Sequence, residues 1–350
     1  MTSLPALTRL HIWLQRLVRW EFWPWRIVYI PVAVYWFFLA IRARGWVFFC
    51  AANPCMRFGG LLAYSKSKIN QLVPEKYLPK TAYLQDGVSV GDAVKSIEQQ
   101  GLCYPLIVKP DIGERGFGVK IVQNEDELKS ALRASGGLKL VQEYADFPME
   151  LGVMYSRHPK EETGKVTSIV IKDLPKVIGD GKSTLQQLIL ANLRTRLSYH
   201  VHERRLGHRF DEVPKEGEEI QVVRIGNHML GTTFNDGNHL IDDELAKVFD
   251  VLAKQIPGFY IGRFDLRTAS IQELKKDNFV VLEVNGVNSE PCHIFHPDSS
   301  IFPAWRDLFK HWKRIAEISI ANHKNGVPYA SYWEIRKEIR QHRQMLKSQD

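Results

Sequence analysis

The fold is decided around the stretch L-I-V-K-P-D-I-G-E-R-G-F-G, residues 106–118. Its first five residues indicate a strand that contains Lys109, and the glycines behind them indicate a flexible turn. A second strand, Val119 to Val122, and a helical stretch, Glu125 to Arg133, follow. The pattern predicts a β-hairpin whose tip exposes backbone N–H groups and can close over phosphates. A purely structural glycine turn is the alternative interpretation.

Two later strands carry oxygen-bearing side chains. They read G-R-F-D-L-R, residues 262–267, and F-V-V-L-E-V-N, residues 279–285. Glu283 and Asn285 share one face of an extended strand because they are two residues apart, and Asp265 ends a plausible neighbouring strand. Two carboxylates and an amide oxygen that converge predict a hard-cation site for Mg²⁺ carrying ATP phosphates. A solvated cluster is the alternative for any one of them.

The length and composition describe a globular chain. Three hundred and fifty residues predict about two domains, or one large domain with an appendage. With 45% hydrophobic and 25% charged residues, the chain is neither disordered nor collagen-like nor a repeat array. Its four cysteines have no C-x-x-C spacing, which excludes a disulfide scaffold, gives no zinc motif and fits a reducing cytoplasm.

The net charge of +8 is unevenly distributed. Residues 1–80 hold 11 Lys and Arg against two acidic residues, and the final fifty residues hold 10 against five. Residues 81–300 hold 26 basic and 32 acidic residues. A nucleic-acid-binding protein would carry a basic central region, so this distribution argues against nucleic acid as a partner.

The N-terminal region has the composition of a membrane interface. Six of the nine tryptophans lie at or before Trp46, and three of them fall in W-E-F-W-P-W, residues 20–25. The uncharged run of 15 residues from Ile27 to Ile41 would span about 22 Å as a helix, against roughly 30 Å of hydrocarbon. Pro31 within it favours a bent or surface-lying segment.

The sequence therefore predicts that residues 11–50 attach to the inner face of the cell membrane, which would make the protein cytoplasmic and membrane-associated. Two alternatives remain open at this stage. One is a signal peptide, against which the late start of the apolar run and the lack of a clean A-x-A site argue. The other is a helical hairpin whose aromatic residues are buried against the rest of the protein.

The ordered motifs between about residues 76 and 300 resemble the ATP-grasp superfamily, and within it the D-alanine–D-alanine ligase and cyanophycin synthetase type of carboxylate–amine ligase. The resemblance implies an α+β ATP-grasp fold in which two subdomains sandwich ATP, preceded here by a helical N-terminal segment. It suggests three regions: residues 1–75 as a Trp-rich basic segment, 76–300 as the ATP-grasp core, and 301–350 as C-terminal helices.

The resemblance also implies roles for individual residues. Nucleotide contacts are expected from Lys109, Gly113, Arg115, Gly116, Gly118, Glu143, Ala145 and Glu150, with Glu143 and the backbone near Ala145 on adenine and Glu150 on the ribose. Asp265, Glu283 and Asn285 are expected to bind Mg²⁺, with Mn²⁺ as an alternative, and Arg263 and Lys172 to act on the transferred phosphate, with Lys176 as a substitute for Lys172. Acceptor-substrate candidates are Arg224, His228, Ser289 and His293, although His228 could equally be an ordinary half-buried histidine.

The stretch G-D-G-K-S-T, residues 179–184, superficially resembles a P-loop. A P-loop needs a glycine five residues before Gly181, where this chain has Lys176. We therefore expect a turn that opens a helix from Leu185 to Asn192.

The sequence departs from the family at both ends. Such ligases usually carry an α/β domain before the core, whereas residues 1–75 hold the Trp-rich segment and an expected linker, Ala51 to Lys68. This replacement suggests a substrate presented at a membrane. After the core, Phe302 to His323 and Ser331 to Lys347 indicate two helices, the second of them basic.

The predicted function is an ATP- and Mg²⁺-dependent ligation of a small-molecule carboxylate to an amine or related nucleophile, through an acylphosphate. A small-molecule kinase and a non-catalytic ATP-binding membrane adaptor are the alternatives, and a homodimer is one assembly that the sequence leaves open.

Overall fold

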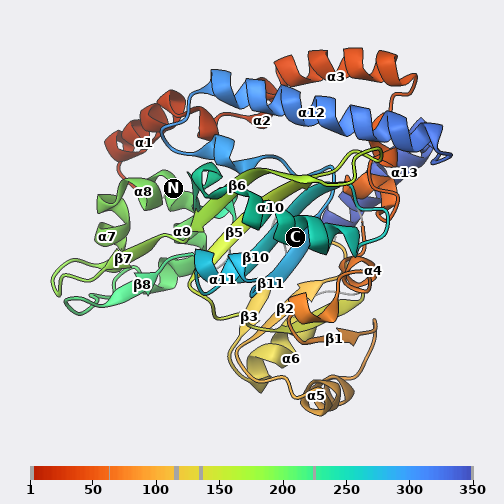
Figure 1. Ribbon diagram of the computed structural model, residues 1–350. Helices are drawn as coiled ribbons and strands as arrows, with labels where there is room; N and C mark the ends of the chain where they lie inside the picture. The colour runs from red at the N-terminus through yellow and green to blue at the C-terminus, as the bar shows by residue number, and fades with distance from the viewer. Residues whose placement is uncertain (1–3, 63, 114–117, 134–136, 224–225, 348–350) are drawn as a thin grey trace.

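The computed structural model describes residues 4–62, 64–113, 118–133, 137–223 and 226–347. Its strands form three antiparallel sheets (Figure 1). The small sheet has the order β1-β4-β2-β3 and consists of β1 (Thr81–Leu84), β2 (Leu106–Pro110), β3 (Lys120–Val122) and β4 (Lys139–Glu143). The large sheet has the order β11-β10-β5-β6-β9 and consists of β5 (Met149–Ser156), β6 (Lys165–Asp173), β9 (Thr233–Asp236), β10 (Ile261–Thr268) and β11 (Val280–Asn285). The third sheet pairs β7 (Lys176–Ile178) with β8 (Glu219–Gln221).

Amphipathic helices bury the apolar face of each sheet. The small sheet shares a core with α5 (Val90–Gln99) and α6 (Glu125–Arg133). The large sheet packs its inner side against α10 (Asp243–Lys254), through residues that include Phe249 and Phe264. The remaining helices of the core are α4 (Lys66–Asn70), α7 (Leu185–Ala191), α8 (Leu193–Leu197), α9 (Tyr199–Leu206) and α11 (Ile271–Lys275).

The two ends of the chain pack together along one side of the molecule. In Figure 1, α1 (Ala6–Val18), α2 (Trp25–Val28) and α3 (Ile30–Ala43) lie along the upper edge beside the long α12 (Ile301–Lys324). Leu39 and Ala43 of α3 share a core cluster with Ile315 of α12. The final helix, α13 (Tyr332–Lys347), joins the same cluster through Ile335.

The uncharged N-terminal run is broken, as its proline suggests. The first helical piece ends at Val28, Tyr29 caps it, and Pro31 lies in the first turn of α3, where its missing N–H is not needed. The longer piece has only 14 residues. Among the described residues, none of the helices combines the length and the apolar character that crossing a membrane would need.

The stretch from Ala51 to Lys68, expected to be a linker, is instead largely built into the core. Asn53 is fully buried and donates to the carbonyls of Gly59 (3.1 Å) and Ile261 (2.7 Å). Its Oδ1 accepts from the N–H groups of Tyr260 (2.9 Å) and Ile261 (3.0 Å). This stretch therefore holds the N-terminal segment firmly to the start of β10.

Most of the expected elements are present. The predicted hairpin of β2 and β3 pairs antiparallel, and β10 and β11 are neighbours in the large sheet. Asp265 lies inside β10 rather than at its end, because the strand continues to Thr268. The G-D-G-K-S-T stretch does open a helix, α7, through a capping box between Thr184 and Gln187.

Candidate active site

A cavity of about 950 Å³ lies between the two larger sheets and continues beneath the N-terminal segment. Most of the described residues predicted for the site line it: Lys109, Gly113, Glu143, Ala145, Glu150, Lys172, His228, Arg263, Asp265, Glu283, Asn285 and Ser289. Gly118 and His293 do not line it. Arg115, Gly116 and Arg224 lie outside the described residues.

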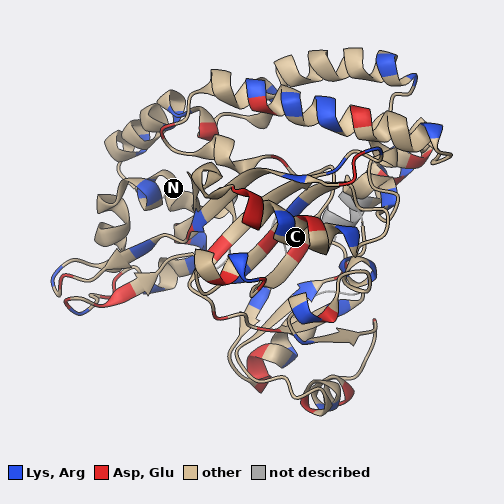
Figure 2. Cartoon of the chain, viewed as in Figure 1, with Lys and Arg blue, Asp and Glu red and all other residues tan. Residues whose placement is uncertain are grey.

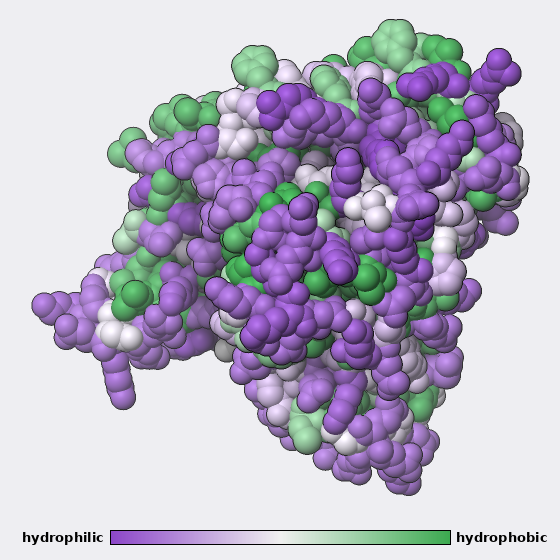
Figure 3. Space-filling view, in the orientation of Figure 1, coloured by the Kyte–Doolittle hydropathy of each residue, from purple (hydrophilic) through white to green (hydrophobic). Residues whose placement is uncertain are grey.

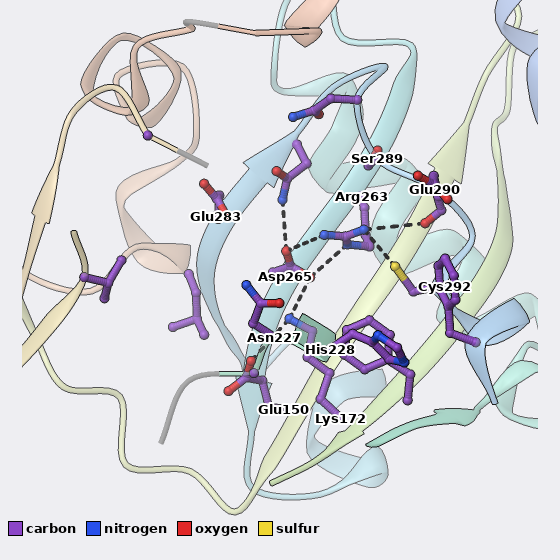
Figure 4. A pocket seen from close by; sticks show the side chains of 18 of the residues that line it. Glu150, Lys172, Asn227, His228, Arg263, Asp265, Glu283, Ser289, Glu290 and Cys292 are labelled. Atoms are coloured by element: carbon purple, nitrogen blue, oxygen red, sulfur yellow. Dashed lines mark hydrogen bonds and ion pairs between the residues drawn. The ribbon is translucent and has the colours of Figure 1, made fainter. Parts of the chain in front are cut away.

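The centre of the cavity is a buried group around Asp265. Its carboxylate accepts from Arg263 Nε (2.9 Å) and Nη2 (3.0 Å), and Lys172 Nζ lies 3.0 Å from Oδ1. Asn285 Nδ2 donates to Oδ2 over 2.9 Å. Figure 4 shows Asp265, Arg263 and Lys172 turned toward one another. Burial would raise the pKa of Asp265, but Arg263 and Lys172 outweigh burial and lower it to about 2, so the carboxylate is charged at neutral pH.

Strand register brings this group together. Arg263 pairs with Asn285, and Asp265 with Glu283, across β10 and β11. Residues opposite each other in an antiparallel pair project to the same face, so these four side chains lie on one side of the sheet. Basic and acidic positions alternate along β10, whereas β11 carries one charged residue, Glu283; Figure 2 colours the charged positions of the sheet.

A second ion-pair group extends from Lys172 toward the small sheet. Glu150 bridges Lys172 (Oε1 to Nζ, 3.2 Å) and Arg267 (Oε2 to Nη2, 3.0 Å), and all three side chains are buried. Burial would lower the pKa of Lys172, but Asp265 and Glu150 together raise it above its ordinary value. The Lys172 ammonium is thus charged in the absence of a ligand.

The position of Glu150 also explains the glycine at position 226. A Cβ added to Gly226 would lie 1.9 Å from Glu150 Oε1, so a larger residue would displace the carboxylate.

Lys109 and Lys66 form the part of the cavity nearest the small sheet. Lys109 is buried and donates to the carbonyl of Leu282 (3.0 Å), while Lys66 Nζ lies 3.4 Å from Glu283 Oε1. Burial lowers the pKa of Lys109 to about 8, although Glu283 opposes that shift. Among the residues that the structure describes, no carboxylate forms an ion pair with Lys109, and such a buried ammonium gains stability when an anion such as phosphate enters.

The residues expected near adenine lie at the cavity wall. Glu143 is exposed at the end of β4, and the carbonyl of Ala145 accepts from Arg267 Nη1 over 2.9 Å. Of the predicted phosphate loop, Gly113 lines the cavity, and its carbonyl accepts from Lys66 Nζ. Gly118 lies at the end of the hairpin loop, next to β3. Its positive φ of 70° is a backbone conformation that glycine adopts without strain.

Two of the three described acceptor candidates line the cavity, and the third does not. Ser289 is buried and His228 half-buried, and both line the cavity. His228 Nε2 lies 2.8 Å from Oε2 of Glu21, which is buried and also paired with Arg194 (2.9 Å). His293 lies outside the cavity wall, between Ser168 Oγ (2.7 Å) and Asp307 (3.3 Å), which occupy both of its ring nitrogens.

Several residues that line the cavity were not predicted from the sequence. Lys66 and Tyr64 belong to the supposed linker, and Tyr64 donates to Asn285 Oδ1 over 2.9 Å. His311 belongs to α12, where burial lowers its pKa to about 4, so it is neutral at physiological pH. Only Arg267 carried a signal, because it is two residues after Asp265 and therefore shares its strand face.

The oxygen donors fit a cation that a nucleotide also binds. Asp265 and Glu283 face each other, and Asn285 lies beside them. Among the residues the structure describes, no group of three or more His, Cys, Asp and Glu side chains is placed to hold a metal ion. Because Mg²⁺ commonly uses one or two carboxylates together with substrate phosphates, this donor set suits Mg²⁺ bound with a nucleotide.

Comparison with known proteins agrees with this geometry. Residues 66–153 match the family described as the RimK-like ATP-grasp domain. The resemblance to the ATP-grasp superfamily is confirmed. The matched part of the ATP-grasp fold begins at Lys66 and ends within β5, so it contains Lys109 and Glu150 and the whole small sheet.

Curated relatives match parts of the chain. A coenzyme gamma-F420-2:alpha-L-glutamate ligase of Methanocaldococcus jannaschii is 40% identical over 70 residues, which is 20% of this chain and 23% of that protein. A cyanophycin synthetase of Trichormus variabilis is 26% identical over 225 residues, 58% of this chain and 24% of that protein. The chain spans about a quarter of the length of these relatives.

Among solved structures, a D-alanine–D-alanine ligase from Bacillus anthracis is similar at 16% identity, with a TM-score of 0.44 over 75% of this chain and 69% of that one.

Proposed function

We propose that this protein is an ATP- and Mg²⁺-dependent ligase that joins a carboxylate to an amine, through an acylphosphate, at the inner face of the cell membrane. The observation that carries this proposal is the convergence of Asp265, Arg263 and Lys172 in one buried cluster on a cavity that also holds Lys109. The ATP-grasp fold and the ligases among the relatives support the reaction class.

In the proposed reaction a carboxylate oxygen attacks the γ-phosphorus of ATP, so that a new P–O bond forms and the bond to ADP breaks. An amine nitrogen then attacks the carbonyl carbon of the acylphosphate. The C–O bond breaks with its electron pair on phosphate, and the nitrogen loses a proton to solvent. The products are an amide, ADP and inorganic phosphate.

The residues of the cavity would act mainly by electrostatics. Lys109 and Lys172 neutralise the phosphates of ATP, and Arg263 steadies the transferred phosphoryl group or the tetrahedral centre. Asp265, Glu283 and Asn285 would hold Mg²⁺, which when bound supplies charge neutralisation at the phosphoryl oxygens. Because Asp265 also keeps Arg263 in place, its carboxylate has two tasks.

The test is release of ADP and phosphate by the purified chain with Mg-ATP, screened against carboxylates and amines. Glu283→Gln should abolish release, whereas Lys176→Ala should not, because Lys176 pairs with Glu219 on the exposed β7–β8 sheet. ADP release without phosphate release would favour a kinase. Tight ATP binding without turnover in any mixture would favour a binding protein.

Membrane attachment is supported by an exposed apolar surface on the N-terminal helices. We call it the apolar ridge, and it comprises Leu7, Leu10, Trp13, Leu14, Leu17, Val18, Trp25, Ile27, Ile30, Val34, Phe37, Phe38, Ile41 and Trp46. Figure 3 shows hydrophobic residues gathered along α1 and α3 at the upper edge of the molecule. Exposed arginines accompany the ridge, and in Figure 2 α3 is otherwise uncharged along its length.

An apolar surface with basic residues beside it complements an anionic lipid surface. We expect the chain to sediment with vesicles containing phosphatidylglycerol more strongly than with pure phosphatidylcholine. The double variant Leu10→Glu with Phe38→Glu should weaken vesicle binding by about tenfold or more. Val251→Glu is the matched control, since this exposed residue lies on α10, far from the ridge in the fold. Equal binding by both variants would contradict the attachment.

A further inference from the structure

The end of the cavity away from the small sheet is walled mainly by hydrocarbon. Residues 20–29 contribute a continuous strip, and the opposite wall comes from β9, the turn after β11 and α12. The apolar lining residues here are Trp20, Phe22, Trp23, Pro24, Trp25, Val28, Tyr29, Leu61, Phe234, Val287, Phe295 and Trp312, and we call this part the aromatic chamber.

The chamber is held rigidly in place. Trp20 Nε1 donates to the carbonyl of Ser299 (2.7 Å), and its ring stacks on Phe295 with centroids 5.4 Å apart. Trp305 of α12 donates to the carbonyl of Val28 over 2.8 Å. The N-terminal strip is therefore bonded to α12 and forms part of the cavity wall.

Three polar groups of the strip, those of Trp20, Glu21 and Trp23, are already engaged with the protein. Trp23 Nε1 donates to the carbonyl of Leu17 (2.7 Å), and Trp20 Nε1 is used as above. The Glu21 carboxylate is held between Arg194 and His228. Because these donors and this charge are satisfied internally, these residues offer an entering molecule mainly apolar contact.

One nitrogen of the Arg263 guanidinium, Nη1, is weakly engaged, and it lies where the chamber meets the reacting centre. Arg263 uses Nε and Nη2 on Asp265, but Nη1 reaches only Cys292 Sγ (3.0 Å) and the carbonyl of Glu290 at 3.5 Å. A thiol is a weak acceptor, and a carbonyl at that distance is a poor one. Burial raises the pKa of Cys292, so its thiol stays neutral and does not compete with an incoming anion.

The chamber also reaches the surface beside the apolar ridge. Trp25 lines the cavity and is nevertheless 65% exposed. Its neighbours Ile27 and Ile30 belong to the ridge and are 51% and 59% exposed. Trp25 thus belongs both to the outer surface of the molecule and to the wall of the cavity that Arg263 also lines.

We propose that the aromatic chamber binds an amphiphilic carboxylate, whose acid group lies at Arg263 and whose hydrocarbon part fills the chamber toward Trp25. This deepens the proposed function and rests on it, because it names the class of the carboxylate substrate. The carboxylate is the group that becomes phosphorylated, and the chamber and the nucleotide end belong to the same cavity.

The probes are butanoate, octanoate and dodecanoate, titrated calorimetrically into the protein with Mg-ADP present. Affinity should rise by about two- to fourfold for each added methylene, because each buries apolar surface. Dodecanol should bind more weakly than dodecanoate, since it lacks the charge that Arg263 attracts.

Val28→Trp fills the chamber and should weaken dodecanoate binding by about tenfold or more, while Mg-ATP binding stays unchanged. Ile30→Trp is the matched control, because Ile30 is exposed and lies outside the cavity lining. If Val28→Trp does not fold, Trp25→Ala replaces it, since truncation of an exposed side chain preserves the core; it should weaken dodecanoate by severalfold.

The two proposals fail separately. A wild-type chain that does not bind Mg-ATP overturns the proposed function. Normal Mg-ATP binding, combined with carboxylate affinity that ignores chain length or is unchanged in Val28→Trp, overturns the chamber assignment alone.

A second arm identifies the source of the amphiphile, using labelled palmitate in phosphatidylcholine vesicles. Slower transfer to Phe38→Glu than to wild type assigns it to the bilayer. Equal transfer assigns it to the aqueous phase, and transfer to neither protein overturns the chamber.

Discussion

The two ends of the cavity are built on opposite principles. The nucleotide end consists mainly of charged side chains on strands of the two larger sheets, and Lys172 and Arg263 neutralise Asp265 there in a buried network. The aromatic chamber consists of apolar side chains from the N-terminal strip, β9 and α12, and the charge of Glu21 is already neutralised there by the protein. The first suits a polyanion and the second suits hydrocarbon, so the two ends of the cavity suit two chemically different molecules.

The variant Asp265→Asn should separate the two ends of the cavity most strongly. The amide removes one metal-binding oxygen and leaves Lys172 and Arg263 without their shared charge, so ADP release should fall by about a thousandfold. The apolar walls of the aromatic chamber do not include this carboxylate, and Arg263 keeps its charge although it loses the partner that holds it, so dodecanoate should still bind. Coupled assays of ADP release and calorimetry on the same preparation measure both. A loss of dodecanoate binding in a folded variant would show that the two ends are not separable.

The next largest effect is expected from Asn53→Ala, which disturbs the connection between the N-terminal segment and the start of β10. Asn53 makes four buried hydrogen bonds to the backbone, two of them to Ile261 at the start of β10. Leaving these groups unsatisfied should lower the free energy of unfolding by about 3 kcal/mol or more. Urea denaturation measures the change. Gln255→Ala, on the exposed end of α10, is the control and should change stability by less than about 0.5 kcal/mol.

A pH titration should affect the nucleotide end alone. Because the pKa of Lys109 is lowered to about 8, its ammonium loses its proton as pH rises through 8, and phosphate binding favours the protonated form. The affinity for Mg-ATP should therefore be flat below pH 7.5 and fall by up to about tenfold per pH unit above 8. In Lys109→Arg the decline should be absent up to pH 10, as followed by equilibrium dialysis. A decline that persists in that variant would assign the titration to another group.

The smallest change should concern only the aromatic chamber. Trp20→Phe removes the hydrogen bond to Ser299 but keeps an aromatic ring against Phe295. The free energy of unfolding should therefore fall by about 1 kcal/mol. Dodecanoate should bind about twofold to fivefold less tightly because the wall is less firmly held. Mg-ATP affinity measured in parallel should not change. A larger effect on Mg-ATP than on dodecanoate would reverse the assignment of the two ends.

The nucleotide end was largely predictable because its residues lie in regular strands. A period of two placed Glu283 and Asn285 on one face, and β-branched residues marked the strands that hold Glu283 and Lys109. The helix after the G-D-G-K-S-T stretch was predictable from its local capping chemistry. What the local pattern did not contain is the register that sets Asp265 opposite Glu283, which depends on the pairing of two distant strands.

The aromatic chamber was not predictable because it depends on contacts far apart in the sequence. Composition alone offered either a membrane surface or a buried hairpin for the N-terminal helices. The structure shows that α3 packs one side against α12 and exposes the other, since Leu39 is buried while Phe38 is 61% exposed. Lys66 and His311 reach the cavity only through tertiary packing, so no local sequence motif predicted their place in it.

The docking of the N-terminal strip on α12 has a consequence during synthesis. Val28 and its partner Trp305 are separated by 277 positions. At about 5 to 20 residues per second, the ribosome needs about 15 to 55 seconds to make the partner after the strip. For that interval the nascent chain carries a tryptophan-rich, positively charged segment with no α12 to cover it. The strip can reach its final position only after α12 has been made, so this wall of the cavity is completed late in synthesis.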